Sequence, residues 1–137
     1  MNFDNNQSVS DLVSEFEMMK QQGQIAFMEE SSFLKLVKFY EEEERLNEAL
    51  EVIEQAIQQY NFSADLYIKK AQLLIDGHQE DLALETLELA LIYAPAELEI
   101  HLLRAEAFIA LDLFSEALIL LNELKRQTDN SKELSEI

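Results

Sequence analysis

A 34-residue spacing of small and apolar residues is the feature that most constrains how this chain can fold. Ala49, Ala83 and Ala117 each lie 34 positions after the one before. The same shift superimposes five further sets of mostly small or apolar residues: Phe33, Tyr67 and His101; Val37, Ala71 and Ala105; Tyr40, Leu74 and Phe108; Ile53, Leu87 and Leu121; Ala56, Ala90 and Leu124. A period of this length is typical of stacked units, each of which leaves an apolar face for its neighbour to cover.

Each period predicts two helices joined by a turn. In the middle copy a stretch that begins near Tyr67 reaches a turn at 76–78, and a second stretch ends before Pro95, which lacks an N–H and restricts the preceding residue. Alanines in both stretches let the two backbones approach closely. The predicted helices are 31–43, 46–60, 65–76, 80–94, 98–111 and 114–127.

Residues before the repeats predict one additional helix. Ser8 and Asp11 have the spacing of a capping box, and Gly23 is a natural stop, so an amphipathic helix is expected over 9–22. Its apolar stripe contains Leu12, Phe16 and Met19. Ile25, Phe27 and Met28 are expected to anchor the following connection. The composition agrees with an all-α protein of one domain, because two Gly and one Pro in 137 residues leave little turn material for a β-rich fold.

The repeated residues resemble the tetratricopeptide repeat. The match is carried in the middle copy by Tyr67, Ala71, Leu74, Ala83, Leu87, Ala90 and Pro95, in the first by Phe33, Leu36, Val37, Tyr40, Ala49, Ile53 and Ala56, and in the third by Ala105, Phe108, Phe114, Ala117 and Leu121. Lys70, His101, Arg104, Leu124 and Asp129 depart from the pattern. The leading helix looks like those that precede such repeats in bacterial repeat proteins.

The resemblance implies an all-α, right-handed superhelix of three helix pairs with an additional N-terminal helix. The expected organisation is an N-terminal helix and connection over 1–29 and repeats over 30–63, 64–97 and 98–131, followed by a tail or the start of a fourth repeat over 132–137. The alternative is that the chain is the N-terminal fragment of a larger protein of this kind.

Charge restricts the kind of partner. Twenty-eight acidic and ten basic residues give a formal charge of −18, which repels phosphate and disfavours nucleic acid and anionic membranes. The first residues lack the basic and apolar regions of a signal peptide, and no apolar run is long enough for membrane insertion. A cytoplasmic protein that binds a basic or apolar protein or peptide is therefore expected.

No residue set predicts catalysis, a cofactor or a metal site. The chain has no cysteine, and its two glycines cannot form a phosphate-binding loop. The run Glu41–Glu44 cannot converge on one cation, because consecutive helical residues point about 100° apart. We therefore expect an interaction module that is not an enzyme.

The family resemblance implies a concave groove lined by the first helix of each pair. The residues expected to line it for a bound peptide or helix are Leu34, Lys38, Ile68, Lys69, Gln72, Ile75, Leu102, Leu103, Glu106 and Ile109. Lys38 and Lys69 fall where some family members clamp a carboxylate, but Leu34, Glu99 and Leu103 occupy other clamp positions, so no such clamp is expected. The leading helix could instead cover this groove.

The third repeat predicts a contact with another molecule. Glu51 and Glu85 share a water-facing position that becomes Ile119 in the third repeat. A helix that is apolar on all sides is expected to be covered. The cover would be a second copy in a homodimer, another partner, or the rest of a longer chain. The residues expected to take part are Leu111, Leu113, Ile119, Leu120 and Leu124.

Overall fold

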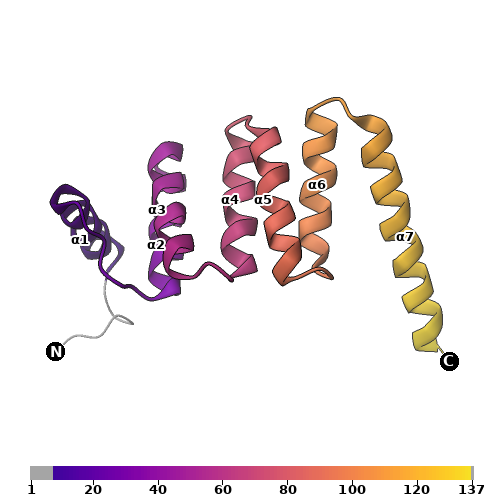
Figure 1. The fold of residues 1–137 in the computed structure, drawn as a ribbon, viewed down its shortest axis with the longest axis horizontal. Helices are drawn as coiled ribbons and strands as arrows, with labels where there is room; N and C mark the ends of the chain where they lie inside the picture. Colours follow the sequence, from indigo (N-terminus) through magenta and orange to yellow (C-terminus); the bar gives the residue numbers. More distant parts are fainter. Residues whose placement is uncertain (1–7, 137) are drawn as a thin grey trace. The chain divides into compact units, whose positions relative to one another are not determined.

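Seven α-helices follow one another along the residues that the structure describes, and no strand occurs among them (Figure 1). The structure is a computed structural model that describes the backbone of residues 8–136 and the side chains of residues 8–130. The helices are α1 (Val9–Gln22), α2 (Glu30–Glu42), α3 (Leu46–Gln59), α4 (Ala64–Asp76), α5 (Glu80–Tyr93), α6 (Leu98–Ala110) and α7 (Phe114–Glu136). The predicted all-α helical repeat is confirmed.

The predicted helix ends agree with the structure to within one residue at every helix except the last. The last helix was expected to end at residue 127, but α7 continues to Glu136. This prediction is wrong because no Gly or Pro follows Leu124 to stop the helix. Inside the extension the Thr128 hydroxyl donates to the Leu124 carbonyl at 2.9 Å, a bond that is compatible with a continuous helix.

The turn inside each helix pair has the same backbone conformation in all three repeats. Glu44, His78 and Asp112 lie 34 residues apart and adopt left-handed φ angles of 58°, 61° and 62°. Each donates its N–H to the carbonyl three residues earlier at 3.0 Å, and the next residue donates to a carbonyl five residues earlier at 2.8 Å. This pair of bonds is a Schellman motif, which satisfies the last carbonyls of the first helix. Gly23, with φ 81°, ends α1 in the same way.

The chain divides into two compact units, Met1–Leu66 and Tyr67–Ile137. In the first unit α1 packs on α2, and the buried side chains of both helices include Leu12, Phe16, Phe33 and Tyr40. The predicted N-cap is present, since the Ser8 hydroxyl accepts from the Asp11 N–H at 3.1 Å.

The connection between α1 and α2 is held mainly by hydrogen bonds from the end of α3. The Gln59 amide bonds the backbone of Ala26 and Met28, and the Tyr60 hydroxyl donates to the Met28 carbonyl at 2.6 Å. Phe27, which was expected to be an anchor, is 76 % exposed, and its ring lies 5.8 Å from the Tyr60 ring, centroid to centroid. Its expected burial is wrong because the polar bonds, rather than this ring, fix the segment.

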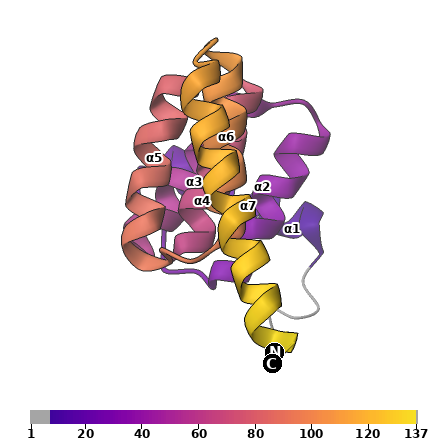
Figure 2. The same ribbon diagram turned by 90° about the vertical axis from the view of Figure 1, so that its right-hand side faces the viewer.

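In the second unit α6 packs against both α5 and α7, as Figures 1 and 2 show. Ala83, Leu87 and Ile100 have no exposed surface, and Ala107 is equally buried. The Tyr67 and Tyr93 rings stack with centroids 6.0 Å apart, which ties the start of α4 to the end of α5. Large and small side chains together form the core of this unit.

Candidate interaction surfaces

In the first unit, two of the expected groove residues lie on α2, the helix on which α1 packs. Lys38 is exposed and Leu34 is half-buried. α1 is tied to this helix pair by two polar contacts: the Tyr40 hydroxyl donates to Glu17 at 2.9 Å, and the Lys20 amine lies 2.9 Å from the Glu51 carboxylate. The leading helix therefore packs at this end of the first repeat and leaves Lys38 accessible.

Burial and these contacts shift the pKa values of Tyr40 and of a carboxyl group near it. Burial, with a smaller effect from the hydrogen bond to Glu17, raises the pKa of Tyr40 to about 12. The Arg45 guanidinium lies over the Tyr40 ring at 4.9 Å and bonds Glu48 at 2.8 Å. The bond from Arg45 lowers the pKa of the Glu48 carboxyl. This cluster has a structural role, because it joins α1, α2 and the start of α3.

In the second unit, the expected groove residues separate into buried and exposed sets. Ile68, Ile75 and Leu103 are buried, and their place in a binding groove stays a prediction. A 3.0 Å hydrogen bond from the Gln72 amide to the Glu99 carboxylate links α4 to the start of α6. Lys69 and Gln72 are half-buried. Three residues on α6 remain exposed: Leu102, Glu106 and Ile109.

Equivalent positions of the second and third repeats differ sharply in exposure. Ile68 is 5 % exposed, whereas Leu102 is 48 % exposed, and Ile75 at 9 % corresponds to Ile109 at 47 %. On the second helices, Leu87 is fully buried and its counterpart Leu121 is 37 % exposed. The three exposed residues of α6 and α7 at these positions, together with Leu98, which is exposed at the start of α6, form an apolar surface that we call the open face: Leu98, Leu102, Ile109 and Leu121.

The residues expected to support self-association lie beside the open face and are partly accessible. Leu113 and Ile119 are exposed. Leu111, Leu120 and Leu124 are half-buried. The accessibility of Ile119 agrees with its place in the position of Glu51 and Glu85. Association through these residues stays a prediction.

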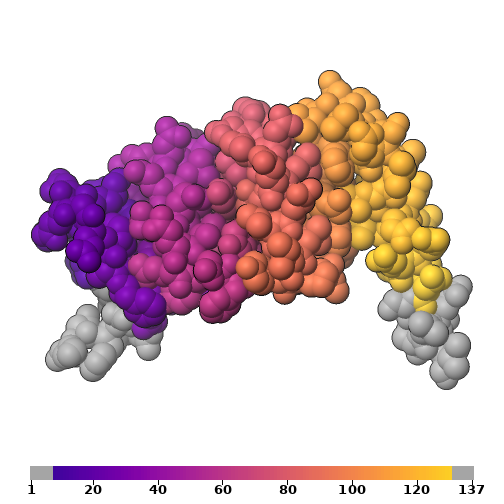
Figure 3. Space-filling model, viewed as in Figure 1, coloured from indigo at the N-terminus to yellow at the C-terminus, as the bar shows by residue number. Residues whose placement is uncertain are grey.

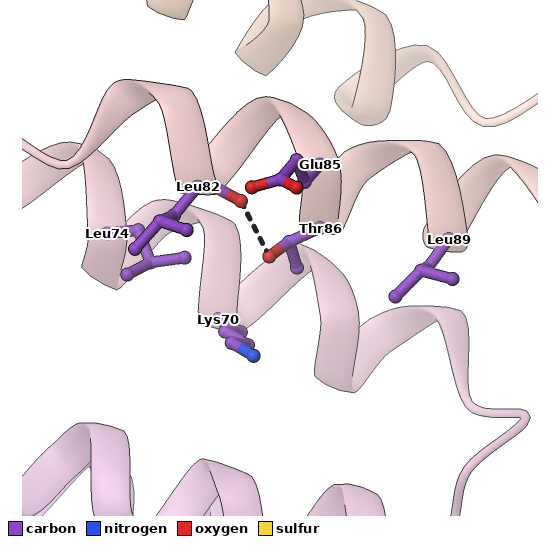
Figure 4. A pocket seen from close by; sticks show the side chains of 6 residues that line it. All are labelled: Lys70, Leu74, Leu82, Glu85, Thr86 and Leu89. Carbon is purple, nitrogen blue, oxygen red and sulfur yellow. Dashed lines mark hydrogen bonds between the residues drawn. The ribbon is translucent and has the colours of Figure 1, made fainter.

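One apolar surface was missed by the sequence reasoning. Leu82, Leu89, Ile92 and Tyr93 are exposed along α5. Beside them a pocket of about 230 Å³ is lined by residues of α4 and α5, namely Lys70, Leu74, Leu82, Glu85, Thr86 and Leu89 (Figure 4). A comparison of the water-facing positions across the three periods would have found this surface, because only the middle period is apolar there.

Two other kinds of site were searched for in the described residues. Among the side chains of residues 8–130, no three His, Asp or Glu residues come together as ligands for a metal ion. No helix of the described chain combines the length and apolar character needed to cross a bilayer. The candidate binding sites among the described residues are therefore exposed surfaces of helices.

Comparisons with known proteins place this fold among helical repeats. No curated protein matches the sequence. One crystal structure of MamA, a protein that contains tetratricopeptide repeats, has a TM-score of 0.70 at 16 % identity and covers 91 % of this chain and 76 % of its own. A second MamA structure has a TM-score of 0.69 at 17 % identity and covers 94 % and 83 %. This likeness confirms the tetratricopeptide-type fold. The family model of the ChAPs, described as Chs5p-Arf1p-binding proteins, matches residues 7–136, so the chain belongs to the ChAPs family.

Proposed function

We propose that this chain is a non-enzymatic interaction module that holds a segment of another protein against the first helices of its repeats. Two observations support a protein as the partner. The fold is a helical repeat, and the family is named for proteins that bind Chs5p and Arf1p. Helical repeats use their extended surfaces for binding. In this proposal residues 30–63, 64–97 and 98–131 act as the three repeats, with 1–29 before them and 132–137 after them.

The open face is the observation that carries the proposal. Leu102 and Ile109 are about half exposed and Leu121 is 37 % exposed, although their equivalents in the middle repeat are buried. Covering the exposed half of Leu102 and of Ile109 would contribute roughly 1 kcal/mol each. Glu106 supplies a polar position on the same helix as Leu102 and Ile109. A partner segment with apolar side chains that repeat at helical or extended spacing fits this arrangement.

Charge supports a basic or neutral segment rather than an acidic one. The chain carries a formal charge of −18, so an acidic segment would be repelled before contact. The exposed carboxylates of Glu99 and Glu106 lie on α6 near the apolar side chains. Lysine or arginine at the edges of the segment would pair with them.

The test is a capture experiment on the open face. A variant with Leu102→Glu and Ile109→Glu replaces two exposed side chains, so the fold should be kept. The matched control is Met18→Glu on α1, where an equally exposed apolar side chain lies outside the proposed surface. Partners captured by wild type and by each variant are quantified by mass spectrometry. We expect the double variant to lose its specific partners and Met18→Glu to keep them. Equal capture by all three proteins would exclude the open face.

The second candidate function is self-association through α7. It is supported by the exposure of Leu118, Ile119 and Leu121 on one helix. Light scattering coupled to size exclusion decides between a dimer and a monomer across a range of concentrations. A dimer that Ile119→Glu converts to a monomer is the expected result if α7 is the interface. A wild-type monomer at high concentration would rule this candidate out.

A further inference from the structure

We propose that the outer face of α5 is a second docking surface, and that its occupant is a basic amphipathic helix of another protein. The surface consists of Leu82, Leu89, Ile92 and Tyr93, together with the pocket beside them. It lies on the second helix of the middle repeat and shares no residue with the open face. The inference therefore goes beyond the proposed function and can fail independently of it.

The repeat register indicates that stacking does not require these apolar residues. In the first repeat the four equivalent positions are Glu48, Gln55, Gln58 and Gln59. In the third repeat they are Glu116, Glu123, Arg126 and Gln127. Eight polar residues at equivalent positions of the same fold show that polar side chains are tolerated there. Tyr93 stacks on Tyr67, but Leu82, Leu89 and Ile92 need a cause other than packing between repeats, and contact with a partner supplies one.

The four side chains lie along one side of α5. Leu82 and Leu89 are two helical turns apart, and Ile92 and Tyr93 continue the row after one further turn. All four are exposed, Ile92 at 67 %. In Figure 2 α5 lies at the outer edge of the second unit, beyond α6 and α7, and Figure 3 shows the salmon-coloured part of this unit at the surface. A helix could therefore lie along this row.

The pocket gives the row a place for a protruding side chain. Leu74 on α4 and Leu82 and Leu89 on α5 supply apolar walls (Figure 4). Between them the Thr86 hydroxyl donates to the Leu82 carbonyl at 2.9 Å, so this polar group is already satisfied. Lys70 and Glu85 complete the lining. The volume of about 230 Å³ suits an aliphatic side chain from the partner.

The surrounding charges identify the occupant. α5 contains Glu80, Asp81, Glu85 and Glu88 and no basic residue, and the last three of these are exposed. Lys70, at the pocket, is the basic residue among its lining side chains. A helix with an apolar stripe flanked by Lys or Arg would cover the row and pair with these carboxylates. A second copy of this chain is a poorer fit, because two chains of charge −18 would bring their Glu85 and Glu88 side chains together.

The experiment uses a peptide of defined sequence as the probe. The variant protein carries, on α5, residues that the third repeat has at the equivalent positions. The probe is a peptide of about 18 residues with leucine at helical spacing on one face and lysine elsewhere. A second peptide has glutamate in place of every lysine. The variant combines Leu82→Glu, Leu89→Glu and Ile92→Arg, which are the residues that the third repeat carries at these positions. Met18→Glu is again the control.

Binding is measured by fluorescence anisotropy at physiological salt, and amide chemical shifts locate the site. We expect the lysine peptide to bind wild type and Met18→Glu equally, with shifts along Leu82–Tyr93. The triple variant should bind at least about tenfold more weakly, and the glutamate peptide should not bind. The variant with Leu102→Glu and Ile109→Glu should keep the shifts along Leu82–Tyr93 even where it loses shifts on α6, which separates this inference from the proposed function.

Several results would overturn the proposal. They are no binding of the lysine peptide, undiminished binding by the triple variant, or shifts confined to α6. A wild-type dimer that the triple substitution dissociates, without peptide binding, would assign the surface to a second copy instead. Circular dichroism checks that the triple variant is folded. If it is not, the single variant Leu89→Glu takes its place, with the same loss of affinity and the same shifts required.

Discussion

The exposure of the open face can be tested by truncating two leucines at equivalent positions and comparing how much each change lowers the free energy of unfolding. Leu87 and Leu121 lie 34 residues apart on α5 and α7, and the first is fully buried whereas the second is 37 % exposed. Leu87→Ala should cost about 2 to 5 kcal/mol, because it removes buried carbons and leaves a cavity. Leu121→Ala should cost roughly 1 to 2 kcal/mol, since fewer carbons leave an apolar environment and water can enter the space.

Urea unfolding followed by circular dichroism gives both free energies, provided that each protein unfolds in one transition. The measurement is made at a concentration at which light scattering finds a monomer. The expected outcome is a larger loss for Leu87→Ala, by about 2 kcal/mol between the midpoints of the two ranges. Equal losses in the monomer would refute the reasoning, because they would mean that Leu121 is as well covered as Leu87. Addition of a partner that binds the open face should raise the cost of Leu121→Ala and leave that of Leu87→Ala almost unchanged.

Three further predictions concern the packing, the turns and the charge cluster. Ala83→Leu should overpack a fully buried contact and lower the free energy of unfolding by roughly 1 to 3 kcal/mol; unchanged thermal melts would contradict the assigned repeat register. Glu44→Gly should raise the melting temperature slightly, because glycine adopts the left-handed φ of 58° without steric cost, and a lower melting temperature would oppose this explanation. Tyr40 has a pKa of about 12 when folded against 10.0 for the ordinary group, so its contribution is complete below pH 10 and is lost as the pH rises through 12. Tyr40→Phe should therefore remove about 1.4 kcal/mol of the stability loss between pH 8 and pH 11, and urea titrations with identical pH dependence in both proteins would show that Tyr40 is not responsible.

Helices were predictable from the sequence because their ends carry local signals. Gly23 and Pro95 mark ends that the structure places within one or two residues of the prediction, whereas the end of α7 has no such residue and was placed too early. Burial on the groove side was harder to predict. Ile68 and Leu102 have the same place in the repeat pattern and differ only in what packs against them, so a pattern within one period cannot distinguish them.

The outer face of α5 was missed for a related reason. Leu82 and Leu89 have helical spacing, and within one period such residues are read as part of the core. Only the comparison with Glu48 and Glu116 shows that this position normally faces water. Phe27 could not be placed from the sequence either. An aromatic residue in a connection is usually taken as a buried anchor, but here the hydrogen bonds from Gln59 and Tyr60 hold the connection.

The turns at Glu44, His78 and Asp112 have a consequence for how such a chain can change its length. Every hydrogen bond that defines them closes within five residues, as the bond from Arg45 to Tyr40 does, so each turn is specified without help from distant parts of the chain. Contacts this local form quickly during folding, because little chain entropy is lost before they are made. Duplication or deletion of one 34-residue period would carry a whole turn with it and would create no new loop. Such a chain can therefore gain or lose complete helix pairs in evolution. The residue with the left-handed φ can vary in type, as Glu44, His78 and Asp112 do.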